Sequence, residues 1–518
     1  MTRALWVIAL IALVVGLFYR GYPLVAGDTA LAEVFMTEDG YLMLTVARNM
    51  AIGLGMSVSE GTIPTNGVQP LATFLFAGAY GAAGGDKVAG LVGVHLIALA
   101  ASVGAAAAMW VLARRVLRAL GYAPVWAWVA TAFFFTGPLL IRHAMNGLET
   151  GLYTLAVLLV LLVLGRVLSQ GREVSLPLAL TIGAVCGVAF LARNDAVFLV
   201  LSAFTVWGLF LLIGVRMPFG RLAARVGPAA LVCLAVIAPW LIHNQLGFGS
   251  IVPISGTAQS TTAGYGANAD LLPAVLFEHM WPMLPIPSGL ERDTPVVLGT
   301  AAVLVPVLAW FAWRVARAGT GLRLVLLAYA LHAGALAYYY GFHFGAPHFL
   351  SRYLAPVAPL LILAAVVAVL DLARAVGRAR GAQVAAGAAL AAFALLAALL
   401  VFFATPAQRE QGHFQVVRWV DENVDAVIWV GAVQTGTLGY WHDRTINLDG
   451  KVNPEALAER LRIGTVLDYV TKSEIDVLAD WQGIAGWIEE ERFGFAEAFE
   501  LVVNDPEQNL AVFRRRPE

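Results

Sequence analysis

The most regular feature of the sequence is a series of long apolar segments separated by short polar stretches. A membrane-spanning helix needs about 20 apolar residues, because a helix rises about 1.5 Å per residue and the hydrocarbon core is about 30 Å thick. Eleven segments approach this length. They lie at about 4–19, 89–113, 123–141, 150–168, 176–193, 196–215, 227–244, 296–313, 324–342, 353–371 and 383–404. The pattern predicts a polytopic α-helical membrane protein with about 11 transmembrane helices.

The first apolar segment has two interpretations. It follows Met1, Thr2 and Arg3, as the apolar part of a secretory signal peptide would. However, no small-residue cleavage site follows closely, and Arg20 ends the segment. We therefore expect a retained transmembrane helix.

Arginine residues mark alternate connections between the apolar segments. With Arg3 in the cytoplasm, every second connection is short and basic, as expected for cytoplasmic loops. The arginines in these connections are Arg114, Arg115, Arg118, Arg166, Arg172, Arg216, Arg221, Arg225, Arg314, Arg317, Arg323, Arg374, Arg378 and Arg380. An odd number of crossings then places the C-terminal segment outside. We expect three large parts on the external side: loops 20–88 and 245–295, and residues 405–518.

The segment from residue 405 to 518 differs from the rest of the chain in its balance of polar and apolar residues. Residues 426–430 and 475–478 have the pattern of strands, and residues 454–461 and 483–492 that of helices. We therefore predict a C-terminal external α/β domain attached to the transmembrane module of residues 1–404.

Composition agrees with this division. The chain is 60% hydrophobic and 13% charged, whereas soluble proteins have about 45–50% apolar and about 25% charged residues. This excludes an ordinary soluble enzyme and a disordered chain. The net charge of −1 gives no overall field that would favour nucleic acid.

The first external loop carries two adjacent carboxylates, Glu38 and Asp39, before a short amphipathic segment at 41–52. Its apolar residues recur at helical spacing, which predicts a helix lying in the membrane interface. One interpretation is that Thr37, Glu38 or Asp39 caps this helix. The other is that a carboxylate near the headgroups acts as a general base for an attacking hydroxyl.

The run from Thr37 to Leu71 resembles the first external loop of GT-C class glycosyltransferases that use polyprenyl-phosphate donors. The likeness is strongest to the actinobacterial arabinofuranosyltransferases, both Emb and AftB-like. That family has an acidic pair followed by an interfacial helix with a polar side, here Glu38-Asp39 and then Ala47-Arg48-Asn49. The family's first acid is an aspartate that is taken as catalytic. Because this chain has Glu38 there, the resemblance leaves both Glu38 and Asp39 as candidates for the base.

Two further segments resemble motifs of the same family. Gly147-Leu148-Glu149-Thr150 resembles its Gly-Leu-Glu-Thr motif. We interpret Glu149 as a functional residue that pairs with Arg142, binds a cation or orients the acceptor, and we assign Tyr41 to the same acceptor or cation support. The alternative is that Glu149 complements the dipole of the helix that begins there. Arg193-Asn194-Asp195 resembles an Arg-Pro-Asp turn. We interpret Arg193 and Asp195 as a structural ion pair, because unpaired charges in a spanning segment are costly.

Arg352 is unexpected in a connection predicted to be external. Arg352-Tyr353 with a following proline resembles the family element that faces the lipid-linked donor. The planar guanidinium suits phosphate oxygens. We predict that Arg352, His348, Tyr353 and Arg48 bind the donor phosphate; the alternative for Arg352 is an ordinary headgroup contact. No metal ligand set is predicted, and a divalent cation stays open.

A turn in the C-terminal segment is the last candidate. Asn447, Asp449 and Asn453 are interpreted as parts of a structural turn, with contact to an acceptor glycan as the alternative.

The resemblance implies transfer of a sugar, with arabinofuranose first, from a polyprenyl-phosphate donor to a cell-envelope glycan or glycoconjugate. It also implies a multi-pass protein of the bacterial plasma (inner) membrane, with the active site and the C-terminal domain on the external, periplasmic side. The expected mechanism is inverting, by analogy with a carboxylate that activates water opposite a leaving group. A sibling enzyme moving mannose or an aminosugar to protein or lipid is the main alternative. A secondary transporter is a weaker one, because its ionisable groups would lie near the midplane, and a scaffolding protein is the third.

Overall fold

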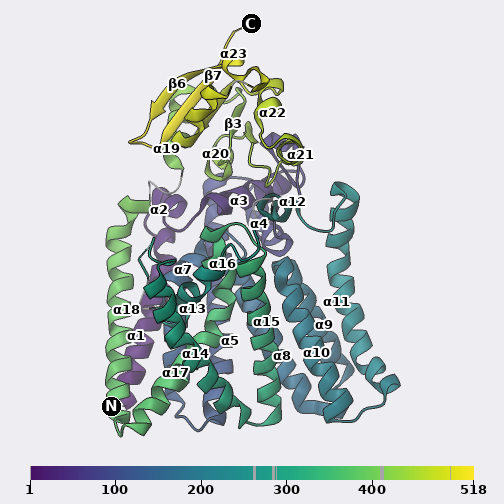
Figure 1. Cartoon of the computed structure of the whole chain (residues 1–518), viewed down its shortest axis with the longest axis vertical. Helices are drawn as coiled ribbons and strands as arrows, with labels where there is room; N and C mark the ends of the chain where they lie inside the picture. The colour runs from purple at the N-terminus through teal and green to yellow at the C-terminus, as the bar shows by residue number, and fades with distance from the viewer. Residues whose placement is uncertain are drawn as a thin grey trace.

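The computed structural model describes residues 2–260, 264–282, 286–287, 289–408, 413–490 and 492–517. A bundle of long helices forms one part, and a small domain containing a β-sheet sits at one end of it (Figure 1). The helices of the bundle are α1 (Thr2–Gly21), α5 (Lys87–Ala119), α6 (Val125–Thr136), α7 (Pro138–Met145), α8 (Thr150–Gln170), α9 (Leu176–Ala192), α10 (Val197–Leu209), α11 (Phe219–Phe248), α14 (Thr294–Ala316), α15 (Thr320–Phe342), α17 (Ala358–Ala375) and α18 (Ala379–Gln408).

Each of the eleven predicted apolar segments falls on one or two of these helices. Eight described helices are long and apolar enough to cross a membrane, and the pair α6–α7, bent by 59°, counts as a ninth if it is one span. The bend occurs at Gly137-Pro138, where proline lacks an N–H and cannot continue α6. α9 and Arg380–Leu396 of α18 are shorter apolar helices. The protein is a multi-pass membrane protein, and this criterion supports eight or nine spans rather than eleven.

Short elements fill the junction between the bundle and the sheet domain. They are α2 (Asp28–Glu33), α3 (Glu38–Ala51), the strand pair β1 (Ser57–Val58) and β2 (Ile63–Pro64), α4 (Pro70–Ala82), α12 (Ile254–Ser260), α13 (Leu272–Met280) and α16 (Leu350–Leu354). α3 is the predicted interfacial helix, and it begins three residues earlier than expected. Its buried side chains share one apolar core with α4 and with Phe414 and Tyr440 of the C-terminal part. α3 is therefore packed between two parts of the protein and is more deeply buried than an interfacial helix.

The C-terminal part is the predicted α/β domain. Its five-stranded sheet has the order β4-β3-β5-β7-β6, in which β3 is parallel to β4 and β5, and β7 is antiparallel to β5 and β6. The strands are β3 (Val430–Ala432), β4 (Thr445–Asn447), β5 (Val477–Asp480), β6 (Phe499–Asp505) and β7 (Leu510–Arg515). The helices are α19 (Phe414–Asn423), α20 (Gly436–Trp441), α21 (Pro454–Ile463), α22 (Leu467–Lys472) and α23 (Phe495–Ala498).

Alternation along the strands explains why both faces of this sheet are covered. Val477 belongs to one apolar cluster and Leu478, the next residue, to the other. Successive strand residues point to opposite faces, so each cluster fills one side. The strand predicted at 426–430 lies at 430–432, and the helical segment predicted at 483–492 is a 3₁₀ helix at 482–489.

Candidate active site

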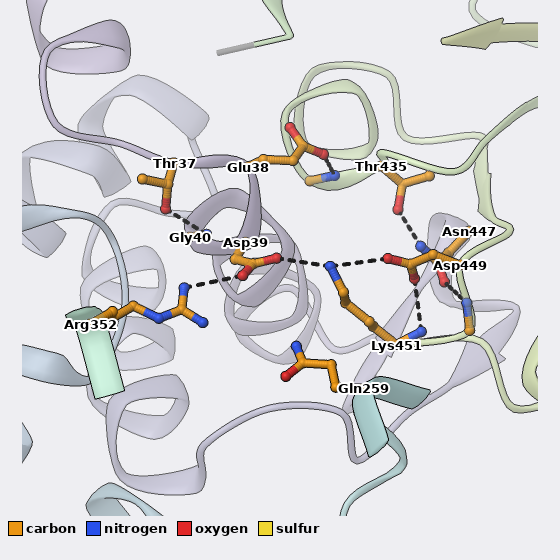
Figure 2. A network of polar contacts seen from close by, with 12 residues as sticks. Thr37, Glu38, Asp39, Gly40, Gln259, Arg352, Thr435, Asn447, Asp449 and Lys451 are labelled. Carbon is orange, nitrogen blue, oxygen red and sulfur yellow. Dashed lines mark hydrogen bonds and ion pairs between the residues drawn. The ribbon is translucent and has the colours of Figure 1, made fainter. Parts of the chain in front are cut away.

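Asp39 lies at the centre of a charged network between the bundle and the C-terminal domain (Figure 2). Its Oδ2 accepts a hydrogen bond from Nη1 of Arg352 at 3.1 Å, and its Oδ1 accepts one from Nζ of Lys451 at 3.2 Å. Lys451 also pairs with Asp449 at 3.2 Å. Burial would raise the pKa of Asp39, but the charges of Lys451 and Arg352 outweigh it and lower that pKa to about 2. Two carboxylates and two cations thus form a neutral group.

The start of α3 explains how Asp39 reaches this network. Thr37 is the N-cap, and its Oγ1 accepts a hydrogen bond from Gly40 N at 3.2 Å. Of the three residues considered as caps, Thr37 is therefore the one whose side chain caps α3. Consecutive helical residues point about 100° apart, so Glu38 and Asp39 face different partners.

Glu38 contacts the C-terminal domain. Its carboxylate accepts hydrogen bonds from Gly436 N, from Thr437 N at 2.9 Å and from Thr437 Oγ1 at 2.6 Å. A Cβ on Gly436 would lie 1.7 Å from the carbonyl oxygen of Glu38, so only glycine permits this approach. Among the described residues, the Glu38 carboxylate thus forms its hydrogen bonds with the first two residues of α20 and holds this helix against α3.

Arg352 stands on α16 among aromatic rings. Its guanidinium lies 4.5 Å from the centre of the Phe349 ring and 5.1 Å from that of Tyr353. The Tyr353 hydroxyl donates to Oε1 of Gln259 at 3.2 Å, and its ring stacks on Tyr340 at 4.3 Å. Stacking and hydrogen bonding hold the α16 side chains in place. The structure therefore brings the predicted residues Arg352 and Tyr353 together with Asp39.

The predicted pair of Arg193 and Asp195 lies behind Tyr353 and is confirmed. Arg193 Nε donates to both oxygens of Asp195 at 3.0 Å, and Arg193 Nη2 donates to the carbonyl of Tyr353 at 2.9 Å. The Tyr340 hydroxyl also donates to Asp195 at 2.6 Å. This buried pair thus supports α16 through the carbonyl of Tyr353 and is separate from the charged network around Asp39.

Glu149 is buried at the start of α8, with 4% of its surface exposed. Burial raises its pKa, while the charges of Arg352 and Arg193 act in the opposite direction. Glu149 is therefore positioned to influence Arg352 electrostatically.

Two predicted site residues lie elsewhere. Tyr41 is fully buried, donates to the carbonyl of Ala32 at 2.7 Å and packs on Tyr440 at 4.9 Å between ring centres. Arg48 pairs with Asp443 at 3.1 Å and donates to the carbonyl of Gly85. The structure brings neither residue into the group around Arg352, because both sides of α3 are engaged in packing against neighbouring elements.

A cleft of about 440 Å³ opens beside the network, between α12, the turn before α16 and the C-terminal domain. This volume lies within the range of about 300–1,000 Å³ that is usual for ligand pockets. It is lined by both polar and aromatic side chains. Among them are Gln259, His348, Phe349, Asp449, Lys451 and Trp487. The predicted residue His348 thus lies on the wall that also carries Lys451.

Lys451 and Gln259 were not predicted as site residues. A signal for Lys451 was present, since the chain has 33 basic residues of which Lys87, Lys451 and Lys472 are the lysines. Of the turn residues, Asn447 accepts from Gly450 N and Asn453 caps α21, as the structural interpretation expects. The described residues contain no group of three or more His, Cys, Asp or Glu side chains placed to hold a metal ion.

Comparison with solved structures identifies the fold. ArnT from Cupriavidus metallidurans matches over 99% of this chain and 98% of its own length in the apo state, with a TM-score of 0.60 and 14% identity. The structure of ArnT bound to undecaprenyl phosphate gives a TM-score of 0.58 at 12% identity, covering 99% of each chain. The oligosaccharyltransferase of Archaeoglobus fulgidus, tethered with an acceptor peptide, gives 0.54 at 14% identity over 95% of this chain and 71% of its own.

Sequence comparisons add less. A domain of unknown function, DUF8728, matches residues 403–512, which is the C-terminal domain. No curated protein sequence matches the chain. At 12–14% identity the structural likeness establishes the fold and no activity. The chain has the GT-C membrane fold with a C-terminal α/β domain.

Proposed function

We propose that this protein is a membrane glycosyltransferase that takes a sugar from a polyprenyl-phosphate donor, with Asp39 as the general base. The observation that carries the proposal is the contact between Asp39 and Arg352 at the junction of the bundle with the outer domain. A carboxylate beside a cation provides a proton acceptor and a phosphate ligand side by side, and the neighbours Lys451 and Phe349 connect this pair to the cleft. The fold supports the proposal, since structures of the same fold bind undecaprenyl phosphate or dolichol phosphate.

The proposed reaction is a single displacement. The acceptor oxygen forms a bond to the anomeric carbon while its proton goes to Asp39. The bond between that carbon and the phosphate oxygen breaks, and its electron pair leaves with polyprenyl phosphate. Because phosphate is a good leaving group, cations at the phosphate take the place of a general acid. Displacement from the opposite face inverts the configuration at the anomeric carbon.

Glu38 is the weaker candidate for the base. Its carboxylate is engaged by the backbone and hydroxyl of Gly436-Thr437, whereas Asp39 accepts a hydrogen bond from Lys451, which lines the cleft. Within this proposal Arg352 contacts the donor phosphate directly, His348 faces it from the cleft wall, and Tyr353 holds Arg352 in position. Glu149 supports the charge of Arg352. Orientation in the plasma membrane, with the C-terminal domain external, follows from the arginine pattern.

The motifs of the first loop favour arabinofuranose and a cell-envelope glycan acceptor. Mannose or an aminosugar is the alternative, and an assay offering each as its polyprenyl-phosphate donor would decide between them.

The test of the base uses purified Asp39→Asn with Asp443→Asn as its matched control. Asp443 also lies between an arginine and a lysine across the same domain junction, at 3.1 Å from both Arg48 and Lys87. We expect Asp39→Asn to lose about 10²–10⁴ in turnover, the usual contribution of a positioned base, and Asp443→Asn to stay near wild type. Turnover that is unchanged in Asp39→Asn would remove the proposed function of this site.

A further inference from the structure

Lys451 connects the C-terminal domain to Asp39 within the charged network. It follows β4 in the segment 449–453, and its Nζ lies 3.2 Å from carboxylate oxygens of both Asp39 and Asp449. Its side chain is 18% exposed and lines the cleft of about 440 Å³. Nζ also stands 5.6 Å from the centre of the Phe349 ring, which Arg352 approaches as well. Two cations therefore flank one ring beside one cleft.

The backbone around Lys451 is held firmly. Gly450 N donates to Oδ1 of Asn447 at 3.0 Å, and Lys451 N donates to Oδ1 of Asp449 at 2.8 Å. Gly450 has a φ of +79°, which favours glycine. The first external loop approaches so closely that a Cβ on Gly67 would lie 2.0 Å from the carbonyl oxygen of Lys451. The backbone of Lys451 is thus held from both domains, and its side chain carries the ammonium group that would change partners.

This arrangement poses a chemical difficulty for Asp39 as a base. Each of its oxygens already faces a cation, so a hydroxyl proton would have to compete with an ammonium and a guanidinium. A carboxylate held in this way has a pKa of about 2 and accepts protons poorly near neutral pH. A phosphate entering the cleft would meet Lys451 on the cleft wall, next to the Phe349 ring that Arg352 contacts, and would offer both cations a second anionic partner.

We propose that Lys451 is the second cation for the donor phosphate, and that donor binding draws Lys451 and Arg352 from Asp39 to the phosphate and so frees Asp39 to act as the base. This inference rests on the proposed function and deepens it. It gives the domain that matches DUF8728 a role, because that domain supplies part of the active site. The site is incomplete without it.

Several groups act on Asp39 in this exchange. From α16 and the turn before it come Arg352 and His348, and from the C-terminal domain come Lys451 and Asp449. Glu149 at the start of α8 interacts electrostatically with Arg352. Asp39 therefore competes with an incoming phosphate for both cations, and removal of its charge should strengthen phosphate binding.

The binding test measures the Kd of undecaprenyl phosphate on the purified full-length protein. We expect Lys451→Gln to weaken binding by about ten- to a hundredfold, the value of one hydrogen bond to a charged group. Lys451→Arg keeps the charge and should stay close to wild type. Asp39→Asn should bind at least as tightly as wild type. The matched control is Lys87→Gln, since Lys87 pairs with Asp443 at 3.1 Å in the same junction and does not line the cleft.

A second measurement uses the wild-type enzyme, so that it does not depend on the folding of a variant. The pH dependence of kcat/KM reports the base in the free enzyme, and that of kcat reports it in the donor complex. If the donor withdraws the cations, the acidic limb of kcat must lie at higher pH than that of kcat/KM. Lys451→Gln, which has lost one cation already, should show a smaller separation.

The outcomes separate the two proposals. Wild-type affinity in Lys451→Gln, or acidic limbs that coincide in the wild type, would overturn the role of Lys451. If Asp39→Asn nevertheless abolished transfer, the proposed function would stand without it. Full transfer activity in Asp39→Asn would instead overturn the proposed function together with this inference.

Discussion

Replacement of Glu38 by glutamine should loosen the C-terminal domain rather than abolish the chemistry. Glu38 accepts three hydrogen bonds from Gly436 and Thr437. A glutamine can keep its oxygen on Thr437, but its NH₂ group then faces the N–H of Gly436, two donors against each other. One bond to a charged group, worth about 1.5–3 kcal/mol, is lost, and the others weaken to the neutral value. We expect a total of roughly 3 kcal/mol.

Hydrogen exchange is the appropriate assay, because local opening free energies govern exchange rates. At about 1.4 kcal/mol per tenfold, this loss predicts that the amides of α20 (Gly436–Trp441) exchange about a hundredfold faster. Glu60→Gln is the matched control. Glu60 pairs with Arg444 across the same junction at 2.8 Å, but both side chains are substantially exposed, so the effect should be below about 1 kcal/mol.

Two results would refute this reasoning. Unchanged exchange of α20 in Glu38→Gln would show that the carboxylate does not hold the domain. Loss of turnover by 10²–10⁴, the range typical of a general base, with α20 exchanging as in wild type, would instead assign the base to Glu38.

Two further predictions concern the contacts of Asp39 and Lys451, and a third concerns the arginine pattern. The pKa of Asp39 is lowered from 3.8 to about 2, so its ionised form stabilises the folded state above pH 3.8 by roughly 2 kcal/mol. This stabilisation is lost as the pH falls through about 2. The melting temperature should therefore fall more steeply between about pH 5 and 2 in wild type than in Asp39→Asn. Gly67→Ala should displace Lys451 and weaken undecaprenyl phosphate binding, whereas Gly78→Ala, with nothing within 4 Å, should leave binding unchanged; equal Kd values would contradict the close approach. Compartment reporters placed between α5 and α6 and after residue 517 should report opposite sides of the membrane, and the same side would contradict the arginine-based orientation.

Much of the fold could be predicted because its signals are local. Apolar length identified each bundle helix, and the change in composition after residue 404 identified the α/β domain. The exact number of spans was less predictable, because α9 is a short apolar helix and Gly137-Pro138 breaks a continuous apolar segment into α6 and α7. Hydropathy measures how apolar a segment is, and it does not register a bend within it.

The site was predictable only in part. Asp39, Arg352, Tyr353 and His348 stood out, because charged or polar residues at the ends of apolar segments are conspicuous. The fates of Glu38, Tyr41 and Arg48 depend on the C-terminal domain, which is separated from them by more than 360 positions in the sequence. Lys451 was not predicted for the same reason, because no local pattern indicates that a turn after β4 reaches the start of α3.

The charge balance gives a reason for placing the base and the phosphate ligands in one network. Without a donor, Arg352 and Lys451 are compensated by Asp39 and Asp449, so the charges of these four residues balance in a largely buried junction. In the proposed reaction Asp39 gains a proton and loses its charge as the phosphate leaves with one more negative charge. Negative charge thus moves from Asp39 to the phosphate without changing the total. The two cations, already drawn to the phosphate when the donor binds, stabilise the charge that the phosphate gains. Because one of them is Lys451, this requires the C-terminal domain to remain docked throughout the reaction.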